Sequence, residues 1–175
     1  MPQPPIRITA KILKTIDRTA NFGKALAALE KTDVLVGIPR EKAAREPDPK
    51  TGKVPGINNA ALGYIHNYGM PTKNIPARPF MEPGIKDVQG AISPRMGDAA
   101  RAALTGRPDV VLRNLNAAGL VAQVGIQKKI RSGPFQPLKP ATLAARRRRG
   151  RTGTKPLIDT SQLLQHISYV VRTAK

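Results

Sequence analysis

Prolines divide this chain into short segments and so limit the folds that it can adopt. The 175 residues include 17 prolines and 15 glycines. Proline ends or kinks helices and interrupts strands, because its φ angle is fixed and it lacks a backbone N–H. Loops or extended arms must therefore join the packed elements. The length suits one domain. We expect it to span residues 1–175, with a flexible loop at about 40–56 and a basic segment at about 133–155.

Helices account for most of the predicted regular structure. Recurring apolar side chains predict a helix at 21–31 capped by Asn21, and one at 83–104 that should kink at Pro94. The most regular pattern, at 108–131, predicts a stripe of buried side chains: Val111, Leu115, Ala118, Ala122, Ile126 and Ile130. A shorter helix should run from Pro140 through the arginines that follow.

One further helix is expected from Asn58, its cap, to Tyr68, before Gly69. Its spacing predicts a buried apolar face made of Ala61, Leu62, Ile65 and Tyr68. The proline-rich stretch 71–79 should then run extended and deliver Phe80 as an apolar anchor.

Strands are few and lie far apart in the sequence. Residues 34–38 are β-branched and end at Pro39, and residues 166–171, after a turn capped by Thr160 or Ser161, should place Ile167, Tyr169 and Val171 on one face. Aromatic residues make up 3% of the chain and there is no Trp, so aliphatic side chains must form the core. We predict an α+β fold: a small, mostly antiparallel sheet packed against two or three helices, with long proline-rich loops.

The strongest compositional feature is a formal net charge of +19. Residues 110–175 hold 13 lysines and arginines beside a single acid, Asp159. A compact body with this charge repels itself unless polyanions or acidic surfaces lie nearby. We therefore expect the C-terminal third to contact DNA or an acidic partner, most strongly through the arginines of the basic segment: Arg146, Arg147, Arg148, Arg149 and Arg151.

The chain lacks a recognisable set of catalytic residues. Neither histidine, His66 or His166, has a second ligand or an orienting carboxylate in its own segment. No serine lies in a nucleophile elbow, no glycine-rich phosphate loop occurs, and no carboxylate pair stands in a catalytic context. We expect neither enzymatic activity, nor a cofactor, nor a metal. A nuclease or peptidase would need acids or histidines that converge from distant segments.

No cysteine is present, which excludes disulfides and thiolate metal sites and suits a reducing compartment. The first residues lack the apolar stretch of a signal peptide, and no run approaches the roughly 18 apolar residues of a membrane span. The sequence therefore predicts a soluble product of the cytoplasm, with no membrane partner.

Three segments together resemble the tail-completion or virion-morphogenesis family of long-tailed bacteriophages, which includes neck proteins of lambda-like and Mu-like phages. The first is the helix that ends in Tyr68-Gly69, followed by residues 75–81, Ile-Pro-Ala-Arg-Pro-Phe-Met. The second is Pro-Leu-Lys-Pro-Ala-Thr at 137–142, where Lys139 stands in place of the usual Ser. The third is Lys-Pro-Leu-Ile-Asp-Thr-Ser at 155–161 before Leu163, where Ser161 replaces the usual Gly.

The matching residues are those to which the resemblance assigns structural roles. They are Tyr68, Gly69, Pro76, Arg78, Pro79, Phe80, Pro137, Leu138, Thr142, Pro156, Leu157, Asp159, Thr160 and Leu163. The resemblance runs from about Val34 to Val171, and is weakest in the loop at 40–56 and in the middle helices.

The resemblance implies a structural virion protein that completes the head-proximal end of a phage tail and helps to join tail to head. It would act in a ring, with six copies expected from tail symmetry, beside tail-tube, terminator or connector proteins. It would be made in the bacterial host cytoplasm and reside in the virion, at the tail top or neck, with non-specific contact to DNA in the channel. The alternative is a basic protein that binds the backbone of DNA or RNA.

Overall fold

The computed structural model describes residues 23–48, 52–54 and 56–173. Residues 23–30 are helical. The remaining elements, in chain order, are β1 (Thr32–Gly37), η1 (Arg40–Lys42), α2 (Asn59–Tyr68), η2 (Pro71–Lys73), α3 (Met81–Lys86), α4 (Gln89–Leu104), α5 (Pro108–Ser132), α6 (Pro140–Arg148), α7 (Gln162–His166) and β2 (Ser168–Thr173).

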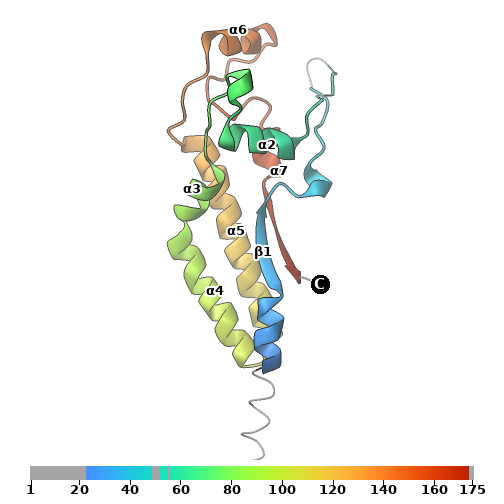
Figure 1. Ribbon diagram of the computed structural model, residues 1–175, viewed down its shortest axis with the longest axis vertical. Coiled ribbons are helices and arrows are strands. Elements are labelled where there is room, and N and C mark those ends of the chain that lie inside the picture. The colour runs from blue at the N-terminus through green and yellow to red at the C-terminus, as the bar shows by residue number, and fades with distance from the viewer. Residues whose placement is uncertain (1–22, 49–51, 55, 174–175) are drawn as a thin grey trace, which may run out of the picture.

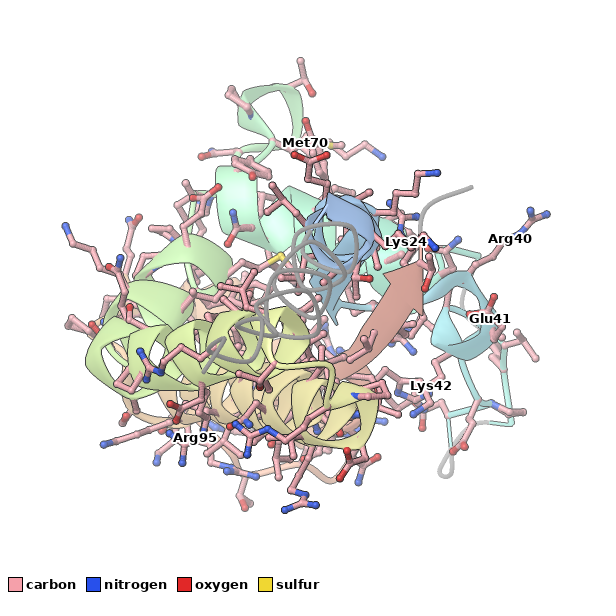
Figure 2. The ribbon with its side chains drawn as sticks, turned by 90° about the horizontal axis from the view of Figure 1, so that it is seen from below. Lys24, Arg40, Glu41, Lys42, Met70 and Arg95 are labelled. Carbon is pink, nitrogen blue, oxygen red and sulfur yellow. The ribbon has the colours of Figure 1, made fainter. Side chains whose placement is uncertain are left out.

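Helix α5 is the central element of an elongated molecule (Figure 1). Helices α3 and α4 pack along one side of it, and strands β1 and β2 pack along another. Helices α2, α6 and α7 gather around one end of α5. Figure 2, which looks along the long axis, shows α4 and α5 side by side. It also shows η1, with Arg40, Glu41 and Lys42, at the margin of the molecule next to β2.

The predicted α5 is confirmed, and its sequence explains its length. Pro108 occupies the first turn, where its missing N–H is not needed. The buried positions are Leu115, Ala118, Gly119, Ala122, Gly125, Ile126 and Ile130, which follow the predicted stripe. Small residues dominate this face, so α4, which buries Ala99 and Ala102, can approach closely. The predicted α6 and the cap of α2 are also confirmed: the Asn58 side chain accepts a hydrogen bond from the Ala61 N–H at 2.8 Å.

The sheet of the described residues has two antiparallel strands, β1 and β2, in agreement with the small antiparallel sheet expected for an α+β chain. Leu35 faces Val170 in the register, and these two side chains are 43% and 44% exposed. The other face covers α5, where Gly119 leaves room for the ring of Tyr169: a Cβ there would collide with it. One face of the sheet is therefore packed, and the other is open and carries the apolar pair Leu35 and Val170 beside the Asp33–Arg172 ion pair.

The apolar core lies where α5 meets α2, α3 and α7. Its buried members are Phe80, Ile126, Ile130, Leu157, Leu163, Leu164 and Ile167. Phe80 is 0% exposed, which confirms its expected role as an anchor. This cluster joins residues that are distant in sequence, so it fixes the first and third motifs relative to α5.

The predicted apolar face of α2 is wrong. The residues that α2 buries are Asn59, Gly63 and Asn67, whereas Ala61 is exposed and Tyr68 is 54% exposed. The buried amides serve loop backbone: Asn59 Nδ2 donates to Ala44 O at 3.1 Å. Hydrogen bonding to irregular backbone, and not apolar burial, decides which side of α2 faces inward.

The helix predicted at 83–104 is interrupted, but it does not restart at Pro94. α4 continues through Pro94, and the break falls earlier, between α3 and α4 at Asp87 and Val88. Pro94 lies near the start of α4, and the carbonyl that it cannot bond belongs to Gly90, around which there is open space. One other expectation differs, because the Ser161 side chain makes no capping hydrogen bond to α7. The predicted cap Asn21 lies outside the described residues.

None of the helices in the described part of the chain is long and apolar enough to cross a membrane.

Candidate functional site

The three sequence motifs meet around one cavity of about 220 Å³. It lies among α2, α6, α7 and the loops between them, at the end of the molecule that carries α6 in Figure 1. The motif residues that line it are Arg78 from the first segment, Leu138 and Thr142 from the second, and Leu157, Asp159, Thr160 and Leu163 from the third. Arg45, His66, Arg146, Arg149 and Gln162 complete most of the wall.

The side chain of Asn67 holds the backbone of the first motif in place through hydrogen bonds. Its Oδ1 accepts from the N–H groups of Phe80 at 3.0 Å and Met81 at 3.1 Å. Gly69 has a φ of 81°, and a Cβ there would lie 2.8 Å from Ala77 N, so glycine is required both for conformation and for space. These contacts explain why Gly69 and the proline-rich stretch occur together.

Arg78 is aimed inward by the same motif. Its backbone N–H donates to His66 O at 2.8 Å, and its Nε donates to Gln136 O at 3.1 Å, just before the second motif. The residue is 5% exposed. Burial, followed by the charge of Arg146, lowers the pKa of Arg78. Among the described residues no carboxylate forms an ion pair with it.

The five arginines predicted to form one contact surface do not have the same environment in the fold. Arg146 is 6% exposed, and its Nη1 donates to the carbonyls of Gly153 at 2.9 Å and Lys155 at 3.0 Å. Its Nε lies 3.3 Å from Asp159 Oδ1. Arg151 forms ion pairs with Asp159, at 2.8 Å, and with Asp48. Both arginines therefore hold the loop after α6 in place, from within the protein.

Arg147, Arg148 and Arg149 are exposed, and they remain available for an external contact. Asp48 belongs to the loop at 40–56, so its pair with Arg151 joins that loop to the segment after α6. Gln162 Nε2 adds a hydrogen bond to Glu46 O at 3.3 Å. The described part of the loop thus contacts the C-terminal third of the chain.

The third motif contains two non-glycine residues with left-handed backbone. Leu157 has φ 63° and Ser161 has φ 64°. The buried side chain of Leu157 belongs to the core, which offsets its backbone strain. Ser161 precedes α7 without capping it, and its left-handed φ is the physical reason why glycine suits this position.

His66, which has no second ligand or orienting carboxylate in its own segment, lines the cavity. Burial, and then the charges of Arg78, Arg146 and Arg45, lowers its pKa. Three buried atoms near these walls lack a hydrogen-bond partner among the described residues: His66 Nδ1, Arg45 Nε and Gln162 Oε1. The sequence offered no signal for Arg45 or Gln162, because their roles depend on packing between distant segments.

Metal ligands do not gather here. In the described ranges no three His, Asp or Glu side chains lie close enough together to hold a metal ion. His166 interacts with its own helix, its Nδ1 lying 2.6 Å from Gln162 O. A larger, mostly apolar groove of about 470 Å³ lies elsewhere, between residues 25–32 and the α4–α5 turn, but no residue of the three motifs lines it.

Comparison with known proteins gives little further information. No protein-family model matches the chain, and no solved structure matches it. A stretch of 33 residues is 48% identical to part of an uncharacterized protein, MJ0331, of Methanocaldococcus jannaschii. This stretch is 19% of the chain and 24% of that protein, so the chain spans about a quarter of the length of this relative.

Proposed function

We propose that this chain is a structural virion protein that completes the head-proximal end of a phage tail and helps to join tail to head. The proposal rests on the resemblance of its three motifs to the tail-completion family. The contacts of those motifs support structural roles for their residues: Gly69 permits a close backbone approach, Phe80 anchors the core, and Asp159 joins Arg146 to Arg151.

The observation that carries the assembly part of the proposal is the amount of exposed apolar surface. On α5, Leu112, Leu120 and Val124 are 54%, 50% and 50% exposed, at spacings that place them on one side of the helix. Leu35 and Val170 add the open face of the sheet. Exposed apolar patches are typical of protein–protein contact sites.

The two strands also present edges that other chains can use. Within the described residues each strand pairs only with the other, so β1 and β2 each have one unpaired edge. Such edges can accept a strand from a neighbouring subunit. We propose that copies of the chain close into a ring through these surfaces, with six copies expected from tail symmetry. Tail-tube, terminator or connector rings would be its neighbours in the virion.

The basic charge favours a ring that surrounds the DNA channel or faces acidic partner rings. The exposed arginines Arg147, Arg148 and Arg149 lie at the end of α6, which forms one extremity of the molecule in Figure 1. In a ring they would be repeated once per subunit. Phosphate neutralisation by such a cluster would be non-specific and sensitive to salt.

The experiment that tests the proposal is the mass of the purified chain by light scattering across a salt series. We expect a multiple of the 18.9 kDa protomer that persists at high salt, because apolar contacts are not screened. Replacing Leu112 and Leu120 together by Gln should reduce the mass to that of a protomer. The control Lys128→Gln, an exposed polar site on the same helix, should not. A wild-type protomer mass throughout would contradict the proposal.

A second candidate function is backbone binding to DNA or RNA, and the exposed Arg147–Arg149 run favours it. It predicts that the protomer alone binds nucleic acid tightly at low salt and releases it at high salt. Replacing Arg147 and Arg148 by Gln should then abolish that binding without changing the mass. Tight binding by a protomer that never assembles would establish this function in place of the first.

A further inference from the structure

The cavity at the meeting point of the motifs holds more positive charge than the fold compensates. Arg45, Arg78, Arg146 and Arg149 line it, and Asp159 is the one carboxylate among its lining residues. Asp159 already interacts with both Arg146 and Arg151. Arg78 is left buried beside another guanidinium group, with one hydrogen bond to a neutral carbonyl.

A buried charge without a partner is costly, and natural proteins rarely retain one without a reason. The Nη groups of Arg78 donate to no atom of the described residues. They are also absent from the fully covered unpaired atoms, so they keep some accessible surface, and Arg78 lines the cavity. A guanidinium fork with free Nη groups is suited to two parallel hydrogen bonds to an oxyanion.

Further donors surround the same space. Thr142, Thr160 and Ser161, which carry hydroxyl groups, are among its lining residues, and hydroxyls donate readily to anionic oxygens. These donors come from α6 and from the turn before α7, whereas Arg78 comes from the loop after α2. Donor residues from three segments around one cavity suit a group with several anionic oxygens, such as a phosphate.

We propose that this cavity binds a phosphate group, held chiefly by Arg78 and also contacted by Arg149. The volume of about 220 Å³ accommodates the group with waters. A doubly charged phosphate compensates two cations at once, which a single carboxylate does not. This inference stands whether or not the chain forms a ring.

Two sources supply a phosphate: the free ion, whose dianion compensates both cations, and the backbone of a nucleic acid, whose phosphodiester carries one negative charge and compensates one of them. Arg149 connects the two, because it lines the cavity and also continues the exposed Arg147–Arg148 run. A backbone that follows the run would bring a phosphate to the mouth of the cavity. A free ion would instead enter as a structural ligand that fastens the three motifs together.

The test is calorimetric titration of the intact chain with inorganic phosphate at neutral pH, with chloride and acetate at matched ionic strength. We expect saturable binding of phosphate, and binding at least about tenfold weaker in Arg78→Gln, since one lost charge-assisted contact corresponds to that factor. The matched control, Arg147→Gln at the exposed end of α6, should bind phosphate as the wild type does. No saturable phosphate binding, equal binding of acetate, or equal loss in both variants would overturn the proposal.

Because Arg78→Gln also changes a buried residue, its fold is checked by circular dichroism, and Arg149→Gln at the exposed rim provides a second variant. Arg149→Gln should weaken phosphate binding by a smaller factor. A short DNA duplex distinguishes the two sources. If the backbone is the source, phosphate competes with the duplex, and Arg78→Gln weakens duplex binding more than Arg147→Gln does. If the free ion is the source, duplex binding depends on Arg147 and is indifferent to Arg78.

Discussion

Two regions of this molecule, the surroundings of the cavity and the α4–α5 pair, are stabilised by different kinds of contact. Around the cavity, buried polar and charged groups such as Asn67, Arg78 and Arg146 tie irregular segments to one another. Along α4 and α5, small residues let two helices approach, and polar contacts lie outside. Charged side chains therefore belong to the packed interior at the cavity end, whereas along the helices they lie on the surface. The following predictions test that contrast, from the largest expected effect to the smallest.

Phe80→Ala should produce the largest loss of stability. The side chain is 0% exposed and lies at the centre of the core cluster. We expect a decrease of about 3 to 5 kcal/mol in the free energy of unfolding, from lost burial and the cavity left behind. Urea denaturation followed by circular dichroism measures it. Tyr64→Ala, at a residue 66% exposed, should change stability by no more than about 0.5 kcal/mol; equal losses would show that Phe80 does not anchor this end.

Asp159→Asn should destabilise the cavity end by about 2 kcal/mol, because it leaves two largely buried guanidinium groups without their shared carboxylate. Those groups belong to Arg146 and Arg151, whose side chains are 7% and 11% exposed. The control is Asp98→Asn, since the pair of Asp98 with Arg101 is exposed. It should cost at most about 0.5 kcal/mol. Equal losses of stability in the two variants would show that the buried ion pairs of Asp159 stabilise the fold no more than the exposed pair of Asp98 does.

Gly125→Ala tests the close helix contact. A Cβ at Gly125 would lie 2.5 Å from Gly84 O and 2.6 Å from a methyl carbon of Val88. Overpacking should cost about 1 to 2 kcal/mol, even after the gain in helix propensity. Gly90→Ala in α4, where nothing lies within 4 Å, should instead stabilise by about 0.5 to 1 kcal/mol. Thermal unfolding of both variants gives the opposite signs directly, and matching signs would contradict the contact.

Ser161→Gly should stabilise the protein by about 0.5 kcal/mol. Glycine relieves the left-handed backbone at φ 64°, and the gain is partly offset by the greater freedom of glycine in the unfolded chain. Leu157→Gly, at the other left-handed position, should instead destabilise, because the leucine is buried in the core. A loss of stability in Ser161→Gly would mean that the serine hydroxyl has a contact that outweighs its strain.

The smallest expected effect is one of pH. Burial and three neighbouring arginines lower the pKa of His66 below its ordinary value of about 6.5. The folded state therefore prefers the neutral ring, and the associated stability is complete above pH 6.5 and is lost as the pH falls through the lowered pKa. Wild type should lose more thermal stability than His66→Gln between pH 7.5 and pH 5. His166→Gln is the control, and parallel curves for wild type and His66→Gln would contradict the shift.

The same contrast explains how far the sequence could predict the structure. The periodicity of apolar residues predicted α5 well, since in an amphipathic helix that spacing indicates which side is buried. It failed for α2, because Asn59, Gly63 and Asn67 are buried for hydrogen bonding and close approach, which apolar spacing does not detect. The small antiparallel sheet was predicted from its two β-branched segments, though not its register.

The arginine run shows a further limit. Five arginines were predicted as one contact surface, and nothing local distinguishes Arg146 and Arg151 from their neighbours. Their separation depends on Asp48 and on the carbonyls of the loop after α6, which come near only in the folded chain. The convergence of His66, Arg45 and Arg78 on one cavity is likewise a tertiary property. Motif order along the chain indicated which segments matter but not that they meet.

The central claim is that this chain assembles with itself through the apolar surfaces of α5 and the sheet. The most direct test is negative-stain electron microscopy of the purified protein at high salt. The account predicts closed rings with a central opening and a constant number of subunits. A field of single protomers, or of open filaments without closure, would contradict it.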